Sequence, residues 1–424
     1  MKTAFLIAAP MSGSGKTTIA RGLMAAFRRM GLTVQPFKCG PDYIDTKFHE
    51  MVCGRPSVNL DTFMASPSHA RILYNRYSAG ADVSVVEGMM GMYDGYDRDR
   101  GSSAEIARVL GLPVVLVVNA RSAAYSVAPL LQGFIRFRDD VRVAGVIFNQ
   151  VGSPRHAAML RQVCDDLGIV CFGCMPKSKD LELESRYLGL DWSLPPTPSQ
   201  GGGDSTEFDT IANAILRHVV PPPLKSPLPS EGVGGRLLFA RNTESFSFIY
   251  QQTIDSFESV RFFDPEREVP VLDDVDLLYL PGGYPEKHLE ALVANDACRQ
   301  AIRDYAERGG HIVAECGGMM YLCREIVTDG GAYAMCGVLP YSISARQADR
   351  KLSLGYRRFT LDGREYRGHE FHYTQFLGEV PPSVCQVYDA KGQPVPTPVF
   401  RYKNVLASYT HLDPCTWEWT IDNV

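Results

Sequence analysis

The sequence contains no apolar run long enough to cross a lipid bilayer. Its longest apolar stretches, such as Leu112–Val118, are far shorter than the roughly 20 residues that a membrane-spanning helix requires. The formal net charge of −5 gives no electrostatic basis for binding nucleic acid or an anionic membrane. One lysine and then a strand-like segment open the chain, so we expect no secretory signal. These absences argue against nucleic-acid and membrane partners and favour a cytoplasmic location.

The eleven cysteines lack the paired spacing of a metal site. Cys171 and Cys174 have CxxC spacing, but no second pair of metal-ligand type accompanies them. We therefore expect reduced thiols in a cytosolic protein. The composition, 45% hydrophobic and 21% charged, is that of a globular protein. A chain of 424 residues exceeds what one core usually organises, so two or three domains are expected.

A turn of small residues stands near the start of the chain, directly after the apolar run Ala4–Ala8. The residues Gly13, Ser14 and Gly15 are small enough for successive backbone N–H groups to approach a triphosphate closely. The strict form of this pattern has a glycine where this chain has Pro10. A chance match in a surface turn is the alternative, but placement between a strand and a helix favours a phosphate-binding loop.

The residues that follow this turn carry the charge and the hydroxyl groups that a nucleotide needs. Lys16 is placed to reach the terminal phosphates, and the Thr17 hydroxyl is placed to bind Mg²⁺. Thr18 continues the motif into a helical stretch expected over 19–30. The sequence therefore predicts a protein that handles a nucleoside triphosphate.

Strand-like and helix-like segments alternate through the first half of the chain. This alternation is typical of a parallel sheet covered by helices on both faces. The expected strands are 83–86, 113–118, 143–148 and 169–172, and the expected helices lie near 102–110, 122–138 and 153–167.

The composition changes between residues 191 and 236, where proline, glycine and serine accumulate around a helical patch that ends at His218. Such a stretch is typical of a linker. We expect a nucleotide-binding domain over 1–220, a linker over 221–235 and a second α/β domain over 236–424. The predicted fold class is α/β, with two domains that each contain a mostly parallel sheet flanked by helices.

The second domain has unusual turns after two of its expected strands. The strand that ends at Leu280 is followed by Pro281–Glu286, a turn rich in exposed N–H groups. The strand that ends at Ala314 is followed by Cys316, in a strand-to-helix turn flanked by glycines. A helix N-terminus stabilises a thiolate, and neighbouring backbone N–H groups can hold an oxyanion. These features indicate a nucleophilic thiol.

A nucleophilic thiol needs a base, and His411 follows a strand-like run late in the same domain. We expect His411 to take and return the proton, and backbone amides near Gly283 and Gly317 to form the oxyanion hole. For Cys316 considered alone, a buried structural cysteine is the alternative. The two glycine turns and the late histidine in one α/β unit favour catalysis instead.

Several segments in order along nearly the whole chain resemble one known family. The carboxyl-terminal half resembles a class I glutamine amidotransferase domain, and the amino-terminal half resembles the dethiobiotin-synthetase-like ATPases of the P-loop class. The whole chain resembles the cobyrinate a,c-diamide synthase family. Besides the phosphate loop, the segments that carry this resemblance are 38–45 (KCGPDYID), 86–95 (VEGMMGMYDG), 145–153 (GVIFNQVGS), 281–286 (PGGYPE), 314–320 (AECGGMM) and 368–373 (GHEFHY).

The resemblance implies an enzyme that uses ATP, Mg²⁺ and glutamine to convert the a and c acetate carboxylates of cobyrinic acid, a corrinoid, into amides. A carboxylate is a poor electrophile, so it must be activated by phosphorylation before ammonia can displace the oxygen. Asp45 and Glu87 are the candidates for metal contacts and catalysis, together with Thr17. A homodimer is possible.

Other residues of the matching segments receive positioning roles from the resemblance. Asp42, Tyr43 and Asp94 are expected to position the metal, the substrate or ammonia. Asn149 ends a strand and is expected to read the adenine edge, although a plain turn role is equally open for it. Many class I glutaminases carry a glutamate two residues after the histidine, where this chain has Asp413, so Asp413 receives only an optional orienting role.

Two alternatives stay open at this point. The same motifs serve hydrogenobyrinic acid or nickel-sirohydrochlorin as substrates in place of cobyrinic acid. The chain could also be a P-loop switch ATPase whose glutaminase-like domain only binds a ligand. Arg186 lies in a further segment that resembles the family, and it either pairs with substrate carboxylates or stabilises a surface helix.

Overall fold

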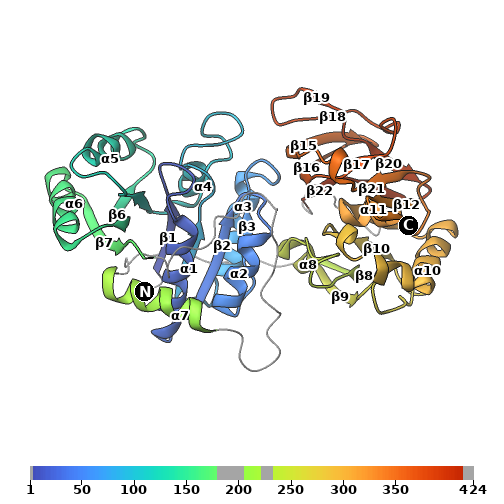
Figure 1. The fold of residues 1–424 in the computed structure, drawn as a ribbon, viewed down its shortest axis with the longest axis horizontal. Helices are drawn as coiled ribbons and strands as arrows, with labels where there is room; N and C mark the ends of the chain where they lie inside the picture. Colours follow the sequence, from blue (N-terminus) through green and yellow to red (C-terminus); the bar gives the residue numbers. More distant parts are fainter. Residues whose placement is uncertain (1–2, 179–204, 221–232, 414–424) are drawn as a thin grey trace. The chain divides into compact units, whose positions relative to one another are not determined.

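The computed structural model describes residues 3–178, 205–220 and 233–413, so Arg186 and most of the expected linker lie outside the described residues. Contacts divide the chain into two compact units. Unit 1 consists of 1–62 and 66–231, and unit 2 consists of 232–424 together with the short segment Phe63–Ala65. Each unit has its own main sheet (Figure 1). Each unit also has its own apolar cores.

Unit 1 contains a seven-stranded sheet in the order β3-β2-β4-β1-β5-β6-β7, and every neighbouring pair in it is parallel. Parallel strands require crossover connections, and helices supply them here. The strands are β1 (Thr3–Ala8), β2 (Val34–Cys39), β3 (Val58–Leu60), β4 (Val83–Glu87), β5 (Val114–Asn119), β6 (Val143–Val151) and β7 (Val170–Pro176). The helices are α1 (Lys16–Arg29), α2 (Ile44–Cys53), α3 (Pro67–Ser78), α4 (Ser103–Leu110), α5 (Val127–Arg136), α6 (Pro154–Leu167) and α7 (Ser205–His218).

Both faces of this sheet are buried, as a parallel sheet requires. Alternate side chains of β1 enter two different cores, with Leu6 in the core beneath α3 to α6 and Ile7 in the core beneath α1. Helix α7 packs beside α1 (Figure 1). Gly22 of α1 leaves room there for Ile211 and Ile215 of α7. The apolar runs of the sequence are therefore strands covered on two sides.

The expected strands and helices of the first half are present with shifted ends. Helix α5 begins at Val127 rather than near residue 122, because Ser122 takes a positive φ of 60° in a turn before it. Strand β7 extends to Pro176, beyond the expected end at Phe172. The two-faced α/β architecture predicted from the alternation is confirmed.

Unit 2 contains a six-stranded sheet in the order β20-β21-β11-β10-β8-β9. All neighbouring pairs are parallel except β20 and β21, which confirms a mostly parallel sheet. Its strands are β8 (Val233–Ala240), β9 (Phe257–Phe263), β10 (Leu277–Leu280), β11 (Ile312–Glu315), β20 (Val399–Tyr402) and β21 (Val405–Ser408). The helices are α8 (Gln251–Asp255), α9 (Leu289–Ala294), α10 (Asp296–Glu307) and α11 (Gly317–Leu322), with a short 3₁₀ turn at Pro285–Lys287.

Two smaller sheets complete unit 2. One has the order β13-β12-β14-β17, and the other has the order β19-β18-β15-β16-β22. The strands of the second matter for the site, since β16 pairs with β22. The strands are β12 (Glu325–Thr328), β13 (Gly331–Ala334), β14 (Ser342–Ser344), β15 (Ser353–Leu361), β16 (Arg364–His372), β17 (Gln375–Phe376), β18 (Val387–Tyr388), β19 (Pro394–Val395) and β22 (Thr410–Leu412).

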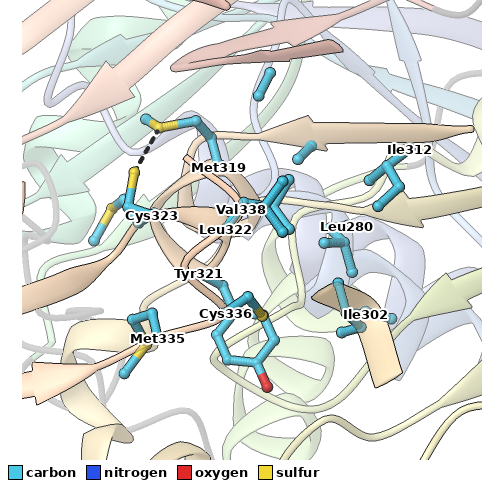
Figure 2. Close-up of a cluster of buried hydrophobic side chains, with 14 of the residues drawn as sticks. Leu280, Ile302, Ile312, Met319, Tyr321, Leu322, Cys323, Met335, Cys336 and Val338 are labelled. Carbon is cyan, nitrogen blue, oxygen red and sulfur yellow. Dashed lines mark hydrogen bonds between the residues drawn. The ribbon is translucent and has the colours of Figure 1, made fainter. Parts of the chain in front are cut away.

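The short helix α11 is held by an apolar core on all sides. Every one of its residues is buried, and Figure 2 shows Tyr321 and Leu322 among side chains from β10, β11 and α10. Met319 and Cys323 touch through their sulfur atoms, 3.7 Å apart. This packing fixes the helix whose N-terminus carries Cys316.

Two further features of the described residues bear on the expectations above. No helix there is long and apolar enough to cross a membrane. The ten cysteines of the described ranges are all free thiols.

Candidate active sites

The predicted phosphate loop joins β1 to α1 and bends through two glycines with positive φ. Gly13 has φ 75° and Gly15 has φ 92°, a region of backbone space that favours glycine. The Ser14 hydroxyl donates to the carbonyl of Met11 at 2.8 Å and braces the bend. The first turn of α1 then directs its backbone N–H groups toward the loop, as in phosphate-binding sites.

Lys16 is the first residue of α1, and its ammonium donates to the carbonyl of Met90. Met90 has a positive φ of 46° and belongs to the 86–95 segment that follows β4. Burial and the nearby charge of Lys38 lower the pKa of Lys16. An ammonium has three donors, so the contact with Met90 leaves capacity for a phosphate.

A cluster of buried charges joins α1, β2, α2 and β4 beside the loop. Lys38 Nζ lies 2.5 Å from Asp45 Oδ2 and 3.0 Å from Glu87 Oε1. Arg21 Nη2 lies 2.9 Å from Asp45 Oδ1, and His49 Nε2 lies 2.6 Å from Glu87 Oε2. Lys38 and Glu87 are register partners on neighbouring parallel strands, so they meet at the carboxyl edge of the sheet.

The charges in this cluster support one another. Burial alone would lower the pKa of Lys38, but Asp45 and Glu87 raise it well above its usual value. Burial alone would raise the pKa of Glu87, but Lys38 and the hydrogen bond with His49 hold it well below its usual range. Both groups are therefore charged at neutral pH. Buried charges are tolerated only when they are paired in this way.

The chemistry of the donor atoms beside the loop suits Mg²⁺. The Thr17 hydroxyl donates to Glu87 Oε1 at 2.7 Å, which places a hydroxyl and a carboxylate oxygen together at the end of β4. Hard oxygen donors of this kind are the ligands that Mg²⁺ takes in nucleotide sites, with phosphate and water completing its shell. Asp45 belongs to the same cluster, but its two oxygens contact Arg21 and Lys38. Within the described ranges, no group of three or more His, Cys, Asp or Glu side chains could hold a metal by itself.

Asp42 and Tyr43 lie at the start of α2. Asp42 Oδ1 accepts the backbone N–H groups of Ile44 at 2.8 Å and Asp45 at 3.0 Å, which caps the helix. Burial and the charge of Asp45 raise the pKa of Asp42. Tyr43 is the residue just before the helix. The structure thus gives Asp42 a local capping role and keeps it beside the charge cluster.

Asp94 and Asn149 each brace a loop. Asp94 Oδ2 accepts the N–H of Gly91 at 2.8 Å and closes the turn that follows β4. Asn149 lies near the end of β6 and donates from Nδ2 to the carbonyl of Ser14 at 3.1 Å. A Cβ at Gly15 would lie 2.1 Å from the same Nδ2 atom, so Asn149 packs directly on the phosphate loop.

The second site is centred on Cys316, which connects β11 to α11 with φ 47° and ψ −107°. A residue other than glycine rarely takes this conformation, and such strain is concentrated at functional turns. The Cys316 N–H donates to the carbonyl of Ser408 at 2.8 Å, and the sulfur lies 3.8 Å from the carbonyl of Phe371. Burial, with the nearby carboxyl of Glu286, raises the pKa of the Cys316 thiol, and the Gly317 N–H acts in the opposite direction.

The two glycine turns singled out in the sequence meet around this thiol. A Cβ at Gly317 would lie 2.8 Å from the carbonyl oxygen of Gly283, and a Cβ at Gly318 would lie 2.0 Å from that of Leu280. Only glycine allows backbone segments to approach so closely. The turn after β10 and the turn after β11 are therefore in direct contact.

His411 is buried on β22, which pairs with β16. The Cys316 sulfur also contacts β16. His411 is the register partner of His369 on β16, the strand that also carries Phe371. Burial, with smaller contributions from His369 and His372, lowers the pKa of His411 to about 3. The imidazole is therefore neutral near pH 7, the form that can accept a proton. The structure thus brings Cys316 and His411 to the same part of β16.

A buried polar network on β16 adjoins this pair. Glu370 accepts hydrogen bonds from His372 Nε2 at 2.7 Å, from the Thr397 hydroxyl at 2.6 Å and from Arg357. Burial alone would raise the pKa of Glu370, but His372 and Arg357 lower it to about 2. The His372 ring stacks on Tyr409, with 3.6 Å between ring centroids. The network holds β16, the strand that both the Cys316 sulfur and His411 adjoin.

Sequence reasoning gave no role to Lys38, His49 or Glu315, although all three take part in these sites. A single charged residue near the end of an otherwise buried strand is the signal that was available for Lys38 and Glu315. His49 lies on α2 and offers no comparable signal.

Two family models match the chain, one in each unit. A CobQ/CobB/MinD/ParA nucleotide binding domain matches residues 5–190. A CobB/CobQ-like glutamine amidotransferase domain matches residues 244–414. The first match indicates that unit 1 belongs to an ATP-using family of nucleotide-binding domains.

Relatives match the chain over nearly its whole length. The hydrogenobyrinate a,c-diamide synthase of Brucella abortus is 38% identical over 96% of this chain and 98% of its own length. That of Rhodobacter capsulatus is 39% identical over 96% of this chain and 97% of its own. The cobyrinate a,c-diamide synthase of Caldanaerobacter subterraneus is 35% identical over 98% of this chain and 96% of its own. With these levels of identity from end to end, the chain belongs to the family of hydrogenobyrinate and cobyrinate a,c-diamide synthases, which are glutamine-dependent amidotransferase ligases.

Proposed function

We propose that this protein amidates the a and c acetate carboxylates of a corrinoid, with ATP as the activating reagent and glutamine as the nitrogen donor. One observation carries this proposal: a phosphate loop and a strained Cys316 turn occur in one chain, within a full-length match to a,c-diamide synthases. A switch ATPase has no use for a strained cysteine turn whose thiol contacts the strand that pairs with a buried, neutral histidine. The geometry therefore favours the ligase over the switch alternative.

Activation of the carboxylate is assigned to unit 1. A carboxylate oxygen of the corrinoid attacks the γ-phosphorus of ATP, the bond to the bridging oxygen breaks, and ADP leaves. Lys16 neutralises the charge on the transferring phosphoryl group, and backbone amides of the loop hold the other phosphates. Mg²⁺, held by Thr17 and Glu87, supplies further charge neutralisation when it is bound.

The charge cluster gives Asp45 and Glu87 their proposed part in this step. Lys38 is fixed between these two carboxylates, so its ammonium is held in place near Thr17 and the loop. A fixed cation beside an anionic acceptor lowers the repulsion between the substrate carboxylate and the phosphates. Asp42, Tyr43 and Asp94 are proposed to shape the acceptor side, and Asn149 is proposed to contact the adenine as well as the loop.

Release of nitrogen is assigned to unit 2. The Cys316 sulfur attacks the side-chain amide carbon of glutamine while His411 takes the thiol proton. The tetrahedral oxyanion is held by backbone amides at Gly283 and Gly317, and His411 returns the proton to the leaving ammonia. Water then hydrolyses the thioester to glutamate. The ammonia attacks the acyl phosphate and releases inorganic phosphate.

The metal content of the corrinoid is a separate matter from this chemistry. The curated relatives named above act on hydrogenobyrinate or on cobyrinate, according to their names. Both substrates present the same acetate carboxylates to the enzyme. We propose a corrinoid of this class as the substrate, and parallel assays with both compounds decide between them.

The test separates the two half-reactions with one variant of the full chain. Cys316→Ser should abolish glutamine-dependent amidation while ATP-dependent amidation with ammonium salt at high concentration persists. The matched control is Cys385→Ser, because Cys385 is a partly exposed free thiol on a different part of unit 2. Full glutamine-dependent activity in Cys316→Ser, or ATP hydrolysis by the wild type that no corrinoid stimulates, would contradict the proposal.

A further inference from the structure

Glu315, the residue directly before the nucleophilic cysteine, is fully buried at the end of β11. It lies in the apolar strand Ile312–Glu315, whose other members belong to the cores of unit 2. A buried carboxylate is costly unless it is paired and hydrogen-bonded. Oε2 of Glu315 lies 3.9 Å from Nδ1 of His411, so the two side chains can form an ion pair once the imidazole is protonated and the carboxyl is ionised.

The carboxylate of Glu315 is held on the side of the imidazole by two neighbouring strands. Oε1 accepts the backbone N–H of Leu412, the residue after His411, at 3.0 Å. Oε2 accepts the Tyr279 hydroxyl from β10 at 2.7 Å. These contacts leave Oε2 facing Nδ1 and couple the position of the carboxylate to the strand that carries the histidine.

The ring of His411 also contacts the backbone of Gly282. A Cβ at Gly282 would lie 2.2 Å from His411 Cε1, so the ring edge rests on the backbone of Gly282. With Cε1 against Gly282 and Nδ1 toward Glu315, Nε2 lies on the edge of the ring away from the carboxyl. When the Glu315 carboxyl is ionised, its charge on the Nδ1 side stabilises the imidazolium that forms during attack.

We propose that Glu315 is the positioning residue that orients His411 and stabilises its charged form during glutamine hydrolysis, an inference that rests on the proposed function of unit 2. It takes the role that the sequence reading left optional for Asp413. The backbone N–H of Asp413 donates to the carbonyl of Arg367, and the charge of Asp413 raises the pKa of Glu315.

The protonation of Glu315 gives the proposal a measurable signature. Burial is the main cause that raises the pKa of Glu315 to about 8, opposed by Tyr279 and the Leu412 N–H and assisted by the charge of Asp413. The other titratable groups around the pair are Cys316 in the adjoining turn and His369, Glu370 and His372 on β16. Only ionised Glu315 can stabilise the imidazolium, so glutamine hydrolysis should increase as pH rises through about 8.

The experiment compares wild type, Glu315→Gln and Asp413→Asn as full chains. Glutamine keeps the shape and the acceptor oxygen but not the charge, so kcat for glutamine hydrolysis should fall by roughly 10²- to 10⁴-fold with little change in KM. The ionisation near pH 8 should be present in the pH profile of wild-type kcat/KM and absent from that of Glu315→Gln. Amidation with ammonia, which bypasses His411, should be unchanged and serves as the control for folding.

Tyr279→Phe provides a second, milder variant if Glu315→Gln does not fold. Loss of the hydroxyl donor should raise the pKa of Glu315 further, so the ionisation should move to higher pH while the rate at high pH recovers. Wild-type rates and an unmoved pH profile in Glu315→Gln and Tyr279→Phe would overturn the proposal, as would a loss found only in Asp413→Asn. A wild-type protein that cannot hydrolyse glutamine at any pH would instead overturn the function proposed for unit 2.

Discussion

Individual buried charges decide how both sites are built. Lys38 neutralises Asp45 and Glu87 in unit 1, and Arg357 neutralises Glu370 in unit 2. For Glu87 and Glu370 the attraction between partners outweighs the cost of burial and keeps the carboxylate ionised. These ion pairs are therefore part of the packing that holds each candidate site in place.

Glu370 gives unit 2 a pH dependence of stability. Its pKa of about 2 lies below the value of roughly 4.3 of an unfolded glutamate, so its contribution is complete above that value and disappears as pH falls toward 2. The difference corresponds to about 3 kcal/mol. Glu370→Gln should lower the free energy of unfolding at neutral pH and flatten its decrease between about pH 4.3 and 2.

The free energy of unfolding is measured by urea unfolding of the full chain at a series of pH values. Proteolysis of unit 2 detects its unfolding. Glu379→Gln changes an exposed glutamate of the same unit and is the matched control. An equally steep loss of stability with acid in Glu370→Gln and in wild type would show that Glu370 does not carry the dependence.

Sequence reasoning found residues that act together with their neighbours in the sequence. It missed residues whose partners lie far away along the sequence. The phosphate loop and the Cys316 turn are made of consecutive residues, so their chemistry is visible in a short stretch of sequence. Lys38 and Glu87 are 49 positions apart, and Glu315 and Leu412 are 97 positions apart. Such pairs depend on which strands become neighbours, and no local pattern specifies that order.

At the level of elements, strand-to-helix turns carry both the phosphate loop and Cys316. The loop between β1 and α1 and the turn between β11 and α11 both follow a parallel strand at its carboxyl end. Parallel sheets generally bind ligands at that edge. The alternation of strands and helices predicted this architecture, but the ends of α5 and β7 shifted because turn conformations there depend on tertiary contacts.

Helices α11 and α5 each contain a glycine, and the space around the two glycines differs. A Cβ at Gly318 would lie 2.0 Å from the carbonyl oxygen of Leu280, whereas a Cβ at Gly133 in α5 meets nothing within 4 Å. Gly318→Ala should therefore displace α11 and destroy glutamine hydrolysis, while ammonia-dependent amidation persists. Gly133→Ala should stabilise the protein by about 0.5–1 kcal/mol, because alanine reduces the entropy of the unfolded chain.

Denaturant unfolding and the two activity assays distinguish these variants. Gly318→Ala should lower the free energy of unfolding, and Gly133→Ala should raise it. Normal glutamine hydrolysis in Gly318→Ala would show that close packing of α11 on β10 is not needed to hold Cys316.

At the scale of the whole molecule, the chain joins two half-reactions that are incomplete alone. Unit 1 carries the groups for phosphoryl transfer, and unit 2 carries those for releasing ammonia from an amide. The sequence predicted this division because each half contains its own set of local motifs. The identity of the acceptor could not be derived from the residues themselves, and it rests on the resemblance and on the full-length relatives.

The most direct test of the central claim is the mass of the corrinoid product. Wild-type protein is incubated with ATP, Mg²⁺ and glutamine labelled with ¹⁵N in its side-chain amide, together with hydrogenobyrinate or cobyrinate. We predict a product that carries two labelled nitrogens in place of two carboxylate oxygens, with ADP and phosphate formed in step. An unlabelled corrinoid, with ATP consumed at the same rate in its absence, would contradict the claim.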